Sequence, residues 1–342
     1  MQIIKPDVNI NFVGRRRMAY AVSALLILAA IASLIFHGGP KYGIDFAGGA
    51  ELLVKFDAPL PIENVKAALK GLQLDGVVQK YGESGSDFYR ILIPADEAEA
   101  DNLAQTLKEG LASQTQKKVS LESFEMVGPQ VGRNLREKAL LAMFFALLFI
   151  TVYISGRFEL KWLLSAATAG ALAFSVYALR LAHLSIPMLM AAALVVTLIL
   201  FYLLNLKYAM GAIVALIHDV IITVGFFSIF DKEFTLPIIA ALLTIIGYSL
   251  NDTIIVFDRI RENLRKYHKL PLSETINKSI NETLSRTILT SGTTLIVIVA
   301  LFVLGGGIIH DFAFALLVGV VVGTYSSIFV ASPILLAWQK RK

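Results

Sequence analysis

The sequence contains no cysteine in its 342 residues, which excludes disulfides, thiolate metal sites and thiol redox chemistry. It also lacks a G-x-x-x-x-G-K-[ST] motif, so a P-loop ATPase is excluded. The long polar segment of the chain has no group of histidines and carboxylates at metal or catalytic spacing. We therefore expect a protein with no cofactor and no metal, and a function other than catalysis.

Charged residues make up only 17% of the chain against 56% hydrophobic residues, and long stretches carry almost none. Most of these stretches reach the ~18 residues that a membrane-spanning helix needs. They predict an α-helical polytopic membrane protein with about eight transmembrane helices. The apolar runs are residues 18–36, 139–156, 162–179, 184–206, 208–230, 234–257, 287–304 and 312–338.

Positive charge is concentrated in the short loops and at the two ends of the chain. By the positive-inside rule both termini, 1–17 and 339–342, are cytoplasmic, and residues 37–138 lie outside. Arg133, Arg136 and Lys138 depart from this pattern, but they follow a long domain, and long domains are translocated largely regardless of charge. Membrane topology thus accounts for the basic excess, and we expect no nucleic-acid partner.

The segment 37–138 is the only long polar stretch, and residues 37–125 carry a net charge of −5. Strand and helix patterns alternate within it in the order β-α-β-β-α-β, which predicts one small α+β ferredoxin-like head. We interpret this head as a binding module rather than an enzyme. The expected elements are strands at 51–56, 76–81, 87–93 and 119–126 and helices at 61–71 and 96–110.

Asp252 is the only charged residue in the apolar run 234–257. It lies six residues, or ~9 Å of helix, inward from Asp258, where a charged segment begins. A charge at that depth is costly, usually faces the protein interior, and commonly serves ion or proton movement. The alternative is a protonated aspartic acid that makes a single interhelical hydrogen bond.

Polar residues form a stripe on each of two predicted transmembrane helices. Thr244, Tyr248 and Asp252 share one face of the first helix, and Arg286 stands at the cytoplasmic end of the second. The two stripes can meet and line a hydrated proton path, or their hydroxyls can bond their own i−4 carbonyls while Arg286 anchors the helix at the interface. The stripe of the second helix comprises Thr287, Thr290, Ser291 and Thr294.

Asp219 lies in the middle of another apolar run, next to His218. Neighbouring helix residues point ~100° apart, so we expect that the two need not act together. Gly211, Ala212 and Ala215 favour close helix packing on the face of Asp219. A G-x-x-x-G sequence in the last span is a weak signal of close helix packing at that span. Asp219 is therefore interpreted either as a packing residue or as a second proton carrier.

Two connecting segments carry further predictions. The sequence GIDFAGG (43–49) includes Gly43, Gly48 and Gly49, and is interpreted either as a tight turn or as a hinge between head and membrane, with Asp45 and Phe46 as part of it. Residues 258–286 have an amphipathic pattern, which predicts a cytoplasmic helix facing the lipid headgroups.

Four stretches together resemble the SecF family, the smaller membrane subunits of the bacterial SecDF protein-translocation complex within the resistance-nodulation-division superfamily. These are YGIDFAGG (42–49), FEMVGPQVG (124–132), GYSLNDTIIVFDRIREN (247–263) and INETLSRTILTSGTT (280–294), and residues 311–336 are similar to the last span of the family. The resemblance covers nearly the whole chain in order.

The resemblance implies a complex in the bacterial inner membrane, with the head in the periplasm and SecD as partner. It implies a position beside the SecYEG channel, and possibly YajC, where the proton gradient helps an unfolded exported polypeptide across after SecA has acted. It also implies roles in proton passage for Asp252 of the NDT motif, with Asn251, and for Arg286 of the SRT motif.

One feature departs from the family pattern of six spans. Residues 162–206 contain two additional apolar runs, between the repeated sequences LKW (160–162) and LKY (206–208). We interpret them as an inserted two-helix hairpin at the periphery of the bundle. The six family spans are then 18–36, 139–156, two within 208–257 and two within 287–338.

Three other functions remain as alternatives. A proton-coupled small-molecule antiporter of the same superfamily is the nearest, although its heads are much larger. An intramembrane aspartyl protease would pair Asp219 with Asp252, but no G-x-G-D sequence is present. A passive scaffold would use the buried charges only for structure.

Overall fold

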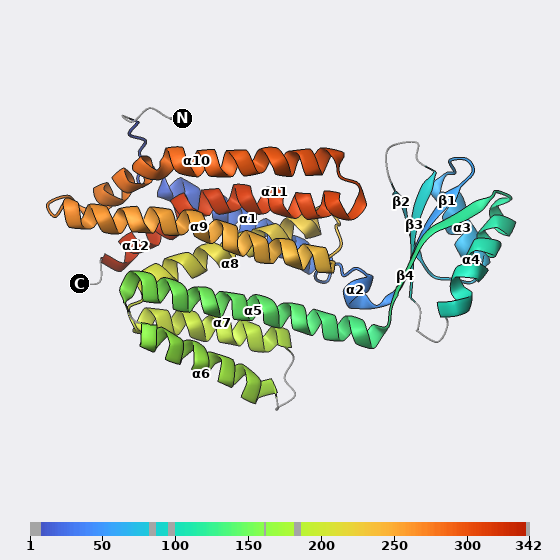
Figure 1. Cartoon of the computed structure of the whole chain (residues 1–342), viewed down its shortest axis with the longest axis horizontal. Helices are drawn as coiled ribbons and strands as arrows, with labels where there is room; N and C mark the ends of the chain where they lie inside the picture. The colour runs from blue at the N-terminus through green and yellow to red at the C-terminus, as the bar shows by residue number, and fades with distance from the viewer. Residues whose placement is uncertain (1–7, 82–86, 95–99, 161, 181–185, 340–342) are drawn as a thin grey trace.

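The computed structural model of the chain describes all residues except 1–7, 82–86, 95–99, 161, 181–185 and 340–342. A helical bundle occupies most of the long axis, and a small head lies at one of its ends (Figure 1). The N-terminal end of α1 and helix α12 both lie at the end of the bundle away from the head, which agrees with termini on one side of a membrane.

The head has the predicted β-α-β-β-α-β order, and its antiparallel sheet has strand order β2-β3-β1-β4. Alternating side chains of β1 and β3 are buried beneath two helices, as the period of a strand requires. The ferredoxin-like prediction is therefore confirmed. The elements are β1 Gly49–Phe56, α3 Ile62–Gly71, β2 Val77–Tyr81, β3 Phe88–Ile93, α4 Ala100–Thr115 and β4 Val119–Val127.

Among the described residues, six helical stretches are long and apolar enough to cross a membrane, so the prediction of a polytopic helical membrane protein is confirmed. Helices α9 and α10 have 31 and 33 residues and exceed the ~20 that a bilayer requires. The six are α1 Arg16–Phe36, α5 Pro129–Glu159, α8 Lys207–Ile229, α9 Leu236–Lys266, α10 Leu272–Leu304 and the stretch made of α11 Gly307–Ser326, the π-helix η2 Ser327–Ala331 and α12 Ser332–Gln339.

The predicted hairpin is present as α6 Trp162–Arg180 and α7 Ile186–Leu203, which lie along α5 (Figure 1). Phe144 and Leu148 of α5, Leu172 of α6 and Ala193 of α7 form a separate apolar cluster to which α9 and α10 contribute nothing. The described apolar parts of α6 and α7 are shorter than the six spans. That these two helices cross the membrane stays a prediction.

The interpretation of residues 258–286 as a headgroup-facing helix was wrong. The segment consists of the ends of α9 and α10, joined by a short turn at 267–271. Its apolar face packs inward, because Ile260, Ile276 and Ile280 are all buried in the main core. The amphipathic pattern thus reflects packing between two helices rather than contact with lipid.

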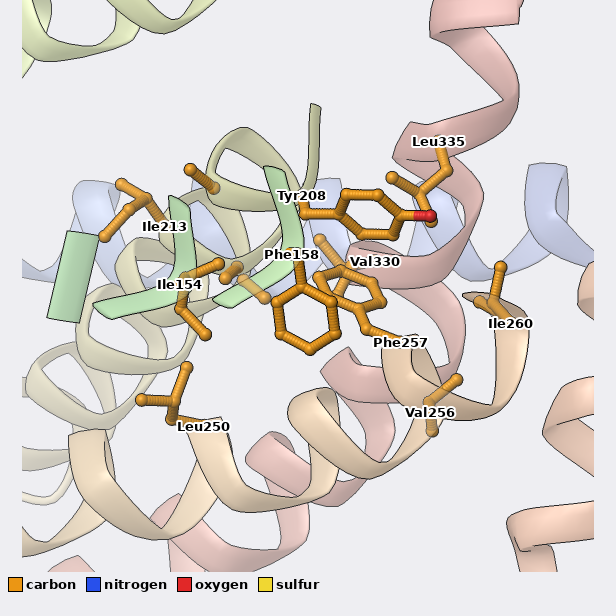
Figure 2. Close-up of a cluster of buried hydrophobic side chains, with 14 of the residues drawn as sticks. Ile154, Phe158, Tyr208, Ile213, Leu250, Val256, Phe257, Ile260, Val330 and Leu335 are labelled. Carbon is orange, nitrogen blue, oxygen red and sulfur yellow. The ribbon is translucent and has the colours of Figure 1, made fainter. Parts of the chain in front are cut away.

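The main core of the bundle is aromatic where α5, α8 and α9 meet (Figure 2). The ring of Phe158 stacks on Tyr208 with centroids 5.3 Å apart, and Phe257 meets both rings edge-on. Closer to the head, Gly319 and Gly323 of α11 allow close approach to α9, since a Cβ on Gly323 would lie 2.9 Å from Cβ of Ser249. The G-x-x-x-G prediction of a helix contact agrees with this packing.

Candidate functional site

Asp252 lies on α9 with only 1% of its surface exposed. The hydroxyl of Ser291 on α10 donates to its Oδ2 over 3.2 Å, and Thr324 Oγ1 of α11 is 2.8 Å from Ser291 Oγ. The acid therefore faces the protein interior, as predicted from its cost in lipid. A chain of hydroxyls connects it to two neighbouring helices.

The two predicted polar stripes meet along the contact between α9 and α10. Besides the Asp252–Ser291 bond, Tyr248 OH donates to Thr294 Oγ1 over 3.3 Å. The alternative also applies in part, because the hydroxyls of Thr290 and Thr294 bond carbonyls of their own helix. The buried Oγ1 of Thr287 has no hydrogen-bond partner among the described residues.

Arg286 is exposed on α10 and acts on the Asp252 carboxylate electrostatically, although the two do not form an ion pair within 4 Å. It lines a cavity of about 480 Å³ together with the exposed Asn251. Charged residues from the far ends of α5, α9 and α10 also line this cavity. They are Arg157, Asp258, Arg259, Glu262 and Glu282.

Asp219 is buried in a second polar cluster, which the sequence did not reveal. Its Oδ2 accepts hydrogen bonds from Ser249 of α9 and Ser326 of α11, the latter over 2.8 Å. Its Oδ1 is 2.9 Å from Nδ1 of His218, whose Nε2 is 3.0 Å from the hydroxyl of Ser23 on α1. Although neighbouring helix residues point ~100° apart, the side chains of Asp219 and His218 are in contact. Whether the two act together stays a prediction.

This cluster adjoins the π-helix η2, which begins one residue after Ser326. A π-turn widens the helix locally and often occurs at functional positions. The only signal in the sequence was the presence of serines inside apolar runs, at Ser23, Ser249 and Ser326. Their convergence depends on how four helices are rotated about their axes, which a single sequence does not specify.

The segment 43–49 packs against the start of α9, at the end of the bundle that faces the head. Gly43 N donates to the carbonyl of Phe234 over 2.8 Å, and Asp45 Oδ2 accepts from the backbone N–H of Leu236 over 2.8 Å. Asp45 thereby caps α9 from a distant part of the chain. Phe46, on the short helix α2 Ile44–Ala47, is 2% exposed.

Gly48 and Gly49 have φ values of 80° and 124°, which favour glycine, whereas Gly43 has an ordinary φ of −72°. A Cβ on Gly48 would lie 2.7 Å from Cα of Pro129, and one on Gly49 would lie 2.7 Å from the carbonyl oxygen of Ile93. Both glycines are needed where the head meets the start of α5. A hinge function of the segment stays a prediction.

Two family models match this chain. The model described as protein export membrane protein SecD/SecF, C-terminal, matches residues 107–186 and 175–341, and the two stretches overlap within the hairpin. The model of the SecD/SecF GG motif matches residues 33–60, which include Gly48 and Gly49.

Relatives of similar length match nearly end to end. The protein translocase subunit SecF of Magnetococcus marinus is 42% identical, with 98% of this chain and 94% of the relative covered. That of Desulfurispirillum indicum is 41% identical, over 97% and 92% of the two chains.

Two crystal structures of SecDF are also similar to this chain. That of the translocon-associated membrane protein from Thermus thermophilus is 32% identical with a TM-score of 0.76, and covers 99% of this chain. The super-membrane-facing form of SecDF, also 32% identical, has a TM-score of 0.62 over all of this chain. This chain spans only 40% of the length of either SecDF chain.

Proposed function

The chain belongs to the SecF family, and we propose that it is the SecF subunit of a Sec translocation complex that uses the proton gradient to promote protein export. In this proposal it works with SecD and YajC beside the SecYEG channel, on unfolded polypeptides that SecA has driven into the channel. It also promotes membrane-protein insertion. The complex lies in the bacterial inner membrane, with the head in the periplasm and both termini in the cytoplasm.

The buried carboxylate of Asp252 is the observation that carries this proposal. It lies between α9 and α10, beside hydroxyls, and Arg286 is close enough to act on it electrostatically. The cavity that contains Arg286 and Asn251 opens at the end of the bundle away from the head, where a proton leaving Asp252 reaches the cytoplasm. The ionised and protonated forms of the acid would favour different arrangements of α9 and α10.

The energy available from a proton is sufficient for such a change. A charge moving through ~150–180 mV releases roughly 4 kcal/mol, at ~2.3 kcal/mol per 100 mV. That energy shifts a two-state equilibrium about 10³-fold, for instance from about 1:30 to 30:1. A single proton per movement of the head is therefore adequate, and no nucleotide site is needed in this subunit.

A direct test is export into membrane vesicles containing the complex, at saturating ATP, with and without an imposed proton gradient. We expect the gradient to raise the rate of completed export several-fold only when the complex is present. A protonophore should return that rate to the value without the complex. Equal stimulation by the complex in the presence of the protonophore would contradict proton coupling.

The outer faces of α9 and α10 support a helical partner such as SecD. Thr244, Gly247 and Asn251 lie on one exposed face of α9, and a Cβ on Gly247 would meet nothing within 4 Å. Only 17% of the most apolar stretch of α10 is buried in the chain alone. Small and polar residues at a lipid-depth surface are typical of contacts between helices rather than contacts with lipid.

Because the chain has no cysteine, this surface can be probed at a single site. Asn251→Cys, labelled with a maleimide–benzophenone reagent and irradiated in the membrane, is expected to form a cross-link to SecD in good yield. Phe174→Cys on α6, which is 70% exposed, is the control and should give little or none. Equal yields from both sites would contradict a SecD interface along α9.

A further inference from the structure

The loop between α8 and α9 is joined to the head by buried charges. Arg90 of β3 donates from Nη1 to Glu233 Oε2 over 3.1 Å and from Nη2 to Glu51 Oε2 over 2.7 Å. Gln79 of β2 donates to the other oxygen of Glu233 over 3.2 Å. A single carboxylate of the membrane part thus receives hydrogen bonds from two strands of the head.

The environment of these groups makes the contact specific. The side chain of Glu233 is 8% exposed and that of Arg90 20%. Burial lowers the pKa of Arg90, but the hydrogen bonds and charges of Glu51 and Glu233 raise it, and the net pKa lies above its ordinary value. If Glu233 were neutral, Arg90 would keep its ionic partner Glu51, and its link to the membrane part would be weakened from an ion pair to an uncharged hydrogen bond.

The same loop also holds the chain segment that leads into the head. Phe234 N donates to the carbonyl of Lys41 over 2.7 Å, and Gly43 N donates back to the carbonyl of Phe234. Lys232 forms an ion pair with Asp311 of α11. The loop 231–235 therefore contacts the entrance to the head, the sheet of the head and the neighbouring helix α11.

Helix α9 starts directly after this loop and carries Asp252 sixteen residues further on, at a distance of ~24 Å along the axis. Sharp helix kinks usually occur at an internal proline or at a glycine pair. Between Leu236 and Asp252, α9 has Pro237 only in its first turn and one isolated glycine, Gly247, so we expect no such kink. A displacement of the helix at Asp252 is thus passed to its outer end.

We propose that Glu233, through Arg90, is the positioning contact that passes movement of α9 to the head. This inference rests on the proposed proton-driven function and gives it a mechanical route. In this account the segment 43–49 does not act as a free hinge, because it is held to the same loop and moves with it. The alternative is that the contact only strengthens the attachment of the head.

The experiment uses two spin labels on this cysteine-free chain, in complex with a cysteine-free SecD, reconstituted in vesicles. Lys108→Cys places one label on the exposed face of α4, and Ile308→Cys places the other at the start of α11. We expect the distance distribution between the labels to shift when a proton gradient is imposed. In Glu233→Gln this shift should fall to less than half, while proton uptake by the vesicles persists.

Two further variants separate coupling from simple attachment. The exchange of charges in Arg90→Glu with Glu233→Arg should restore the gradient-dependent shift, because Arg at 233 can pair with both head carboxylates. Asp87→Asn removes a head carboxylate from a loose 4.0 Å ion pair and should behave as wild type. If Glu233→Gln shows the same gradient-dependent change in label distance as wild type, or if the charge exchange does not restore this change, the proposed role of Glu233 is overturned and the proposed function is unaffected. Absence of any shift in wild type overturns the proposed function as well.

Discussion

Asp252→Asn is expected to abolish the gradient-stimulated part of export and to leave assembly with SecD intact. Asparagine has nearly the shape of the acid, and its Oδ1 still accepts the hydrogen bond from Ser291, so the packing of α9, α10 and α11 is retained. Its side chain does not ionise, and the ~4 kcal/mol that one proton supplies is lost. The export rate with an imposed gradient should therefore fall several-fold, to the rate measured without a gradient.

The measurement is the export rate in vesicles at saturating ATP with an imposed gradient, together with the amount of SecD that co-purifies. Glu274→Gln is the matched control, since it neutralises an exposed acid in the first turn of α10 that does not line the cavity of Arg286, and it should export as wild type. A wild-type rate in Asp252→Asn would favour the structural alternative, in which the acid makes only an interhelical hydrogen bond. Loss of SecD from the purified variant would instead mean that the site holds the complex together.

The head was predictable because its residues follow simple local rules. The alternation of buried and less buried side chains in β1 and β3 and the turns between the elements are local features. Because the sheet has one buried face, this alternation determines which side chains face the core and thereby the register of the strands. The ends of the helices and strands moved by a few residues only. The spans differ more, because α5 begins at Pro129, ten residues before its predicted run, and α10 begins at Leu272, fifteen residues before its own.

The candidate site was predictable only where one helix contact determined it. Tyr248 and Asp252 share a face of α9, and Ser291 and Thr294 share a face of α10, so one contact between two helices joins both pairs. Glu233 was not recognised because its partner Arg90 is 143 residues away and neither lies in a motif. The amphipathic pattern of 258–286 was misleading for a related reason: periodicity gives the apolar face but does not identify what covers it.

The cluster around Asp219 leads to the second large prediction, which concerns stability. Asp219→Ala removes the acceptor for the hydroxyls of Ser249 and Ser326 and the partner of His218, all at positions less than 5% exposed. Leaving several buried donors without acceptors should cost about 3–5 kcal/mol. Asp219→Asn keeps one acceptor oxygen and should cost only about 1 kcal/mol.

Thermal unfolding of the purified complex, with the yield of folded protein, measures this difference. The matched control is Glu262→Ala, which truncates a 61% exposed acid on α9 to the same residue and should leave the unfolding temperature nearly unchanged. An unfolding temperature of Asp219→Ala equal to that of the control would show that the cluster does not stabilise the bundle.

Asp219→Asn also decides between the two interpretations of this acid. Two hydroxyl donors and a histidine contact the Asp219 carboxylate, and Asp219 is not among the residues that line the cavity of Arg286. We therefore expect this variant to keep the gradient-stimulated export that Asp252→Asn loses. If both variants lose it while both complexes remain folded, Asp219 carries protons too, and the path extends from α10 across α9 to α8 and α1.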